Sequence, residues 1–137
     1  MTYPEKIAYL YRYRDALRRE KTIADEIEAL RTEAARVTQA LTGMPGGGDG
    51  QAIPRAVERI MDAQQRLAAE AARCAAARAE VKAAIDTVPD PLRRDILTRR
   101  YILCQRWERI AADIDRDLRW VLRLHHRAVD ELTIESH

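Results

Sequence analysis

Apolar residues recur at heptad spacing through the first 41 residues, in a stretch that contains no glycine and, after Pro4, no proline. From residue 23 the steps alternate between four and three, at Ile23, Ile27, Leu30, Ala34, Val37 and Leu41. This spacing is typical of a coiled-coil helix, and a helix of this length is not stable in water unless it buries the stripe. A second stripe with the same spacing runs from Ile60 to Val88. The sequence therefore predicts two long helices that bury their stripes against each other.

A glycine-rich segment separates the two stripes. Residues 42–54 contain all five glycines of the chain and two of its five prolines. Such a segment cannot remain helical and carries little apolar side-chain surface, so it is predicted to be a mobile loop. We therefore expect residues 1–88 to form a long antiparallel helical hairpin, with the small residues Ala71 and Cys74 opposite Ile23 and Ile27.

A two-helix hairpin leaves much of its apolar surface uncovered. The prediction is a homodimer formed through this coiled coil, and the alternative is a monomer in which the C-terminal helices pack on the hairpin. The residues expected at the dimer interface are the larger apolar members of the stripes: Ile23, Ile27, Leu30, Val37, Leu67 and Val81.

Residues 89–137 are predicted to form a second, all-helical domain. Asp90 and Pro91 favour a helix start, because aspartate caps a helix and proline is tolerated in its first turn. That helix should extend to about residue 102. A short helix is expected over 107–114, and a last one over residues 118 to about 132, capped by Asp117 after a tight turn at 115–117.

The last two helices have the spacing of a helix-turn-helix. This motif needs a small residue where the helices cross, apolar neighbours in the first helix and apolar anchors in the second. The predicted motif core is Trp107, Ile110, Ala111, Ile114, Val121 and Leu124. The opposite face of the last helix is basic and would meet the major groove of double-stranded DNA, with Arg119 and Arg123 as first candidates for base contacts. The predicted DNA-binding residues are Arg116, Leu118, Arg119, Leu122, Arg123, His126 and Arg127.

Composition sets limits on other functions. With 24 basic and 22 acidic residues the net charge is only +2, so a nucleic-acid partner must be argued locally. Cys74 and Cys104 follow no metal or redox spacing, and the adjacent His125 and His126 point in different directions on a helix. No nucleotide loop or catalytic pattern occurs. We expect a cytoplasmic protein without enzymatic activity, cofactor, metal or membrane segment.

Residues 92–132 resemble region four of bacterial sigma factors. The resemblance rests on the pairs Arg100-Tyr101 and Ile110-Ala111 and on Ala128 four residues before Leu132. The chain is also similar to small phage and prophage late-transcription regulators of the ArpU and RinA type. The residues that carry this second resemblance are Leu41 to Pro45, Trp107, Leu124 and His125. This second resemblance implies a phage-encoded or bacterial protein that regulates transcription of late or lytic genes.

The chain departs from the sigma pattern at two turns. Cys104 and Asp115 stand where the pattern has glycine, Arg106 where it has a serine or threonine cap, and Arg116 where it has an apolar residue. Leucines on the predicted DNA face leave an alternative open: a phage assembly, packaging or RNA polymerase adaptor protein that uses the same fold to bind protein.

Overall fold

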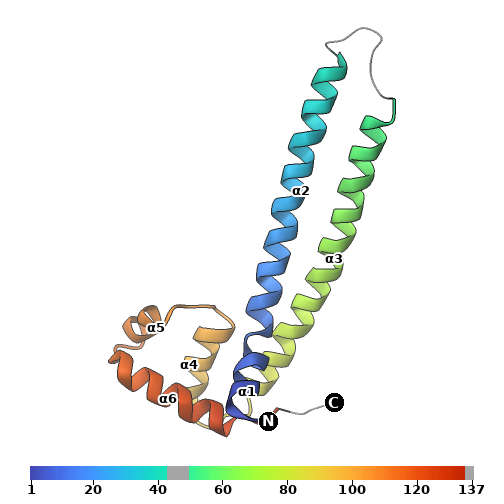
Figure 1. Ribbon diagram of the computed structural model, residues 1–137. Helices are drawn as coiled ribbons and strands as arrows, with labels where there is room; N and C mark the ends of the chain where they lie inside the picture. Colours follow the sequence, from blue (N-terminus) through green and yellow to red (C-terminus); the bar gives the residue numbers. More distant parts are fainter. Residues whose placement is uncertain (43–49, 135–137) are drawn as a thin grey trace. The chain divides into compact units, whose positions relative to one another are not determined.

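The computed structural model describes residues 1–42 and 50–134, and within these ranges the chain is helical without strands. Six helices follow one another along the chain (Figure 1). They are α1 (Tyr3–Leu10), α2 (Arg12–Thr42), α3 (Ala52–Ile85), α4 (Pro91–Tyr101), α5 (Trp107–Asp113) and α6 (Leu118–Glu131). The all-helical prediction is confirmed. Most of the predicted glycine-rich loop, residues 43–49, lies outside the described residues.

Side-chain caps fix the starts of α1, α4 and α6. At α1, Thr2 accepts a hydrogen bond from the backbone of Glu5, whose carboxylate accepts one in return, so two backbone donors are satisfied. Asp90 accepts from the backbone N–H of Arg93 at 3.0 Å and begins α4, as expected from the sequence. Each cap satisfies donors that the first helical turn leaves unpaired.

The chain divides into two compact units, and this division differs from the predicted boundary at residues 88/89. Unit 1 comprises Met1–Ala16 together with Cys74–His137, and unit 2 comprises Leu17–Arg73. Both ends of the expected hairpin therefore belong to the same unit as the C-terminal helices. The sequence pattern concealed this division because the apolar stripes run on through α2 and α3 from one unit into the other.

Unit 2 is a pair of helical segments joined by ion pairs and by a narrow apolar seam. Arg66 donates two hydrogen bonds to Glu26, at 3.0 and 3.1 Å, and Arg19 donates to Glu70 at 2.7 Å. The predicted antiparallel order is present, but the register differs. These pairs set Ile27 level with Ala63. The expected partners of Ile23 and Ile27 were Ala71 and Cys74, and Cys74 belongs to unit 1.

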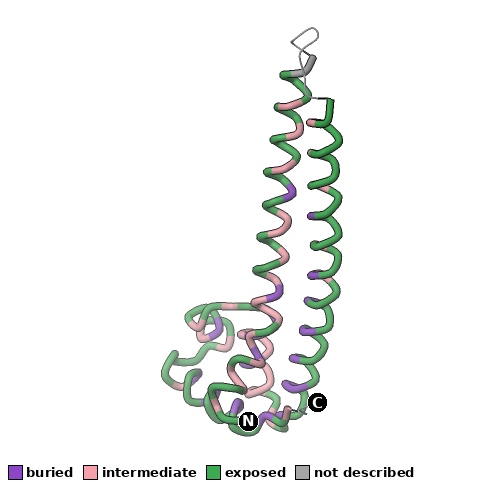
Figure 2. Tube along the Cα trace, turned by 45° about the vertical axis from the view of Figure 1, so that its right-hand side comes forward, coloured by how far each residue is buried: buried purple, intermediate pink, exposed green. Residues whose placement is uncertain are grey.

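The apolar seam of unit 2 is only partly covered. Figure 2 shows few buried positions along its two helices, and among the described residues these are Ile27, Ala63 and Glu70. Four of the predicted interface residues are half-buried: Ile23, Leu30, Val37 and Leu67. A second group of apolar side chains on α3, which the sequence analysis did not single out, is exposed: Ile53, Val57 and Met61.

Unit 1 has a continuous apolar core built from both ends of the chain. Its main cluster contains Leu10 from α1, Val81 and Ile85 from α3, Leu97 from α4 and Val129 from α6, all at most 1% exposed. Val81, expected at a dimer interface, is thus buried inside its own chain. None of the described helices is both long and apolar enough to cross a membrane.

Candidate nucleic-acid interface

The turn between α5 and α6 has the geometry of a tight helix C-terminus. Asp115 adopts a left-handed backbone conformation with φ of 53°, and its N–H donates to the carbonyl of Ala112 at 3.2 Å. The N–H of Arg116 donates to the carbonyl of Ala111 at 3.0 Å. This is a Schellman motif, in which glycine is the usual residue at the left-handed position. Asp115 therefore takes the conformation for which the sigma pattern uses glycine.

The next residues start α6. The carboxylate of Asp117 accepts a hydrogen bond from the backbone N–H of Arg119 at 3.1 Å, so the predicted cap is present. The guanidinium of Arg116 lies over the ring of Trp120, 4.9 Å from its centroid. Arg116, which replaces the usual apolar residue of the turn, is thus supported by an aromatic side chain.

The inward face of α6 packs against α4 and α5. Ile96 of α4, Ile110 of α5 and Val121 of α6 are each 0% exposed and form a second core cluster with Leu124. The structure brings all six predicted motif-core residues into this cluster, because Trp107, Ala111 and Ile114 pack against its edge. α5 and α6 are therefore held as one packed pair on α4.

The outward face of α6 carries six of the predicted DNA-binding residues and the preceding turn carries Arg116, and all seven are exposed. With about 100° between successive residues of an α-helix, Arg119 and Arg123 point directly away from the buried stripe. The side chains of Arg119, Arg123 and Arg127 form no hydrogen bond or ion pair with any described residue. Leu118 and Leu122 lie to one side of this arginine row, 36% and 41% exposed.

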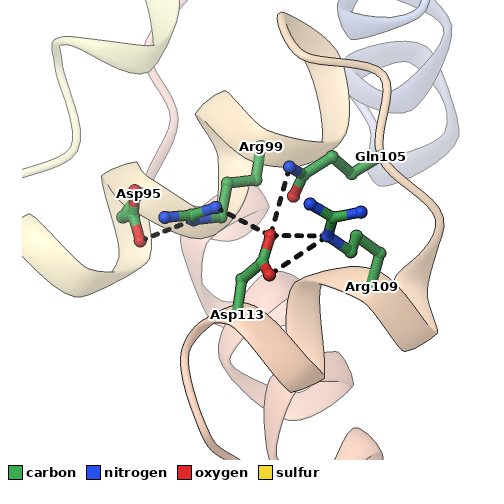
Figure 3. Close-up of polar contacts among 5 residues, drawn as sticks. All are labelled: Asp95, Arg99, Gln105, Arg109 and Asp113. Carbon is green, nitrogen blue, oxygen red and sulfur yellow. Dashed lines mark hydrogen bonds and ion pairs between the residues drawn. The ribbon is translucent and has the colours of Figure 1, made fainter.

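The arginines of α4 and α5 contrast with those of α6, because they are engaged within the protein. Figure 3 shows Arg99 and Arg109 converging on the carboxylate of Asp113, at 3.2 and 3.0 Å, with Gln105 as a further donor to the same group. Arg99 also pairs with Asp95 at 3.1 Å. Arg99 therefore ties α4 to α5, and Arg109 pairs with the same carboxylate within α5.

His126, one of the predicted DNA-binding residues, already has partners. Its ring stacks on Tyr3 of α1, with centroids 4.5 Å apart, and its Nε2 lies 3.5 Å from the carboxylate of Asp130. The C-terminal part of the outward face is thus occupied by α1 and by an acidic residue. The exposed positive charge that remains without such partners is centred on the first two turns of α6.

Sequence reasoning missed an aromatic cluster behind α6. Nε2 of the buried His125 lies 2.6 Å from the hydroxyl of Tyr101 in α4, and the edge of Trp107 meets the His125 ring. Burial, with the nearby Arg100, lowers the pKa of His125 to about 4, and burial raises the pKa of Tyr101. His125 is thus a neutral packing residue.

The N-terminal part of the chain packs against the same cluster through Tyr11. Arg100 donates to the hydroxyl of Tyr11 at 2.9 Å and to the carbonyl of Gln105 at 3.0 Å. Its guanidinium also lies 4.6 Å from the ring centroid of Trp107. The alternation of tyrosine and arginine over residues 9–14 was the signal that could have indicated this packing, although it does not reveal the partner.

Within the described ranges, no group of three or more histidine, cysteine, aspartate or glutamate side chains is arranged to hold a metal ion. No protein-family model matches the chain, and no match was found among curated proteins or among solved structures. The site is therefore interpreted from its own geometry.

Proposed function

We propose that α5 and α6 form a helix-turn-helix that binds double-stranded DNA, and that the protein is a transcriptional regulator of the phage type. The observation that carries the proposal is the row of exposed arginines on α6 that have no partner within the described chain, on a helix whose other face is locked into the core. In this motif the second helix enters the major groove and presents the residues of its first turns to the bases. Arg119 and Arg123 lie in the first two turns of α6.

Arginine suits both tasks of such a helix. It can pair with guanine through two hydrogen bonds or neutralise a phosphate. We assign base contacts to Arg119 and Arg123, and phosphate contacts to Arg116 and Arg127. Asp117 would hold the start of α6 in place while these side chains reach the groove.

Alanine substitution of Arg119 and Arg123 together tests the assignment. Selection from random duplexes with the parent protein provides the probe, and a gel-shift titration measures affinity. Since each bidentate arginine–guanine pair contributes about 1–3 kcal/mol of discrimination, the double variant should lose at least about thirtyfold in affinity for the selected duplex, and with it the preference for that duplex. Helicity measured by circular dichroism should not change.

A charge-matched control separates base reading from general electrostatics. Arg18 and Arg78 are exposed arginines on α2 and α3 whose side chains have no partner among the described residues. Replacing both by alanine removes the same charge and should leave the preference for the selected duplex intact. Equal affinity of the parent and the Arg119/Arg123 variant would end the DNA-reading assignment.

A second function is favoured by one observation, the exposure of Leu118 and Leu122 beside the arginines. It is the adaptor hypothesis, in which the same surface binds a protein such as RNA polymerase or a phage assembly component. Salt dependence distinguishes the two. DNA binding through arginines should weaken steeply as salt concentration rises, because counterions are released from the phosphates. A contact made mainly by leucines should change little.

A further inference from the structure

Leu118 and Leu122 form a short apolar strip along one flank of α6. One turn of helix separates them, so they lie one above the other on the same side, between the buried stripe and the row of Arg119 and Arg123. Asp117 caps the helix just before Leu118, which keeps this first turn ordered. The strip and the arginine row therefore occupy the same two helical turns and would meet the same few base pairs.

The size of the strip limits what it can bind. The two side chains are 36% and 41% exposed, so together they offer on the order of 100 Å² of apolar surface, whereas each partner in a stable protein interface buries roughly 800 Å². The neighbouring charge also favours a polyanion, because Arg119 and Arg123 flank the strip without acidic partners among the described residues. A small apolar group carried by an acidic partner fits both features.

We infer that Leu118 and Leu122 contact the 5-methyl groups of thymines in the major groove, beside the bases that the arginines read. This inference rests on the proposed DNA binding and adds a base preference to it. The thymine methyl is the one apolar group that base pairs present in that groove. The recognised half-site accordingly contains thymine next to the guanine that pairs with arginine.

Removing single methyl groups from the DNA tests this contact. A duplex selected from a random pool by the parent protein is resynthesised with deoxyuridine in place of one thymine at a time, and affinity is measured by titration at fixed salt. Burial of one methyl corresponds to about a fourfold change in affinity. At one or two thymine positions, replacement by deoxyuridine should lower the affinity of the parent about fourfold. The Leu118→Ala and Leu122→Ala variants should each show no further loss of affinity at the thymine that the removed leucine contacts.

Leu103→Ala is the matched control, because Leu103 is an exposed leucine outside α6, in the connection between α4 and α5. This variant should keep the full sensitivity to deoxyuridine. If no thymine position is sensitive, or if the Leu118 and Leu122 variants remain as sensitive as the parent, the methyl contact is refuted while DNA binding stands. If no duplex is enriched by the parent protein, the proposed function itself fails, and with it the inference.

Discussion

The hydrogen bond between His125 and Tyr101 joins α6 to α4 inside the core of unit 1. His125 is 6% exposed and Tyr101 is 1% exposed, so neither ring can bind water in place of its partner. A buried imidazole is most stable when neutral, because desolvation penalises the charged form. Stable burial of this ring therefore requires a deprotonated histidine.

This requirement predicts a pH-dependent stability. In the unfolded chain His125 takes up a proton near its ordinary pKa of 6.5, but in the folded protein it does so only near 4. Between these values the unfolded state binds more protons, so the free energy of unfolding should fall by roughly 2–3 kcal/mol as the pH drops from about 6.5 to about 4. Urea unfolding at a series of pH values measures the change.

Two variants isolate the contribution of His125 to the change of the unfolding free energy with pH. His125→Gln removes the titrating group and should flatten the dependence between pH 7 and pH 5, although it lowers stability at neutral pH. His126→Asn removes the exposed neighbour, whose charge is the smallest of the causes that lower the pKa of His125, and should leave most of the pH dependence in place. A parent protein whose stability does not vary over this range would contradict the assignment of a neutral His125.

At the level of helices, the bounds of α4, α5 and α6 agree with the sequence prediction to within one residue at each end. Local chemistry explains this agreement, since aspartate caps and a first-turn proline act within a few residues. The turns were less predictable. Cys104 and Asp115 adopt φ values of 56° and 53° without being glycine. Asp115 occupies the left-handed position of a Schellman motif, where glycine is usual and aspartate is tolerated better than most residues.

Contacts between distant segments were not predictable from the pattern. The stripe on α1 has the same spacing whether it faces α3 or α6, so periodicity could not reveal that Tyr3 stacks on His126. The predicted register of the hairpin was also wrong. Apolar residues spaced alternately four and three apart repeat every seven residues, so two such helices can be aligned in several registers. The ion pairs Arg66–Glu26 and Arg19–Glu70 accompany one of these alignments.

The contact between α1 and α6 gives a prediction about helix ends. The Nζ of Lys6 donates to the carbonyls of Val129 and Asp130, at 3.3 and 3.1 Å, where α6 has no basic residue of its own in its last turn. A cation at this end satisfies unpaired carbonyls and opposes the helix dipole. Lys6→Met should therefore lower the free energy of unfolding by about 0.5–1 kcal/mol.

Thermal and urea unfolding measure this effect, with Lys21→Met as the control. Lys21 is an exposed lysine of α2 whose one ion pair among the described residues is with Asp25 in its own helix, an interaction worth a few tenths of a kcal/mol. A loss in the control as large as that of Lys6→Met would attribute the change to the general loss of positive charge and not to the end of α6.

For the molecule as a whole, the exposed stripe on α3 revises the proposed dimer surface. Ile27 and Val81 are buried within one chain and offer little to a second copy, whereas Ile53, Val57 and Met61 are 43–55% exposed. We therefore propose that a second copy covers this stripe together with the half-buried seam of unit 2. A dimer of this kind would carry two helix-turn-helix motifs, as binding to two DNA half-sites requires.

Light scattering tests the revised surface. The parent should have twice the mass of one 15.7 kDa chain, and Val57→Glu with Met61→Glu should reduce it to that of a single chain, because burying the new charges is costly. Glutamates at Ala72 and Ala76, exposed positions of the same helix about three turns or more beyond Met61, should leave the dimer intact. A parent mass equal to one chain would reject the dimer.

The discontinuity of unit 1 in sequence has a consequence for the order of folding. Residues 17–73 are synthesised between its two segments, and they can form their own helix pair from contacts that are relatively close in sequence. The apolar side of α1 leaves the ribosome early, but its partners on α6 are made only after more than a hundred further residues. During translation this side therefore stays partly uncovered until α6 has been made, and α1 is a segment for which a chaperone would compete.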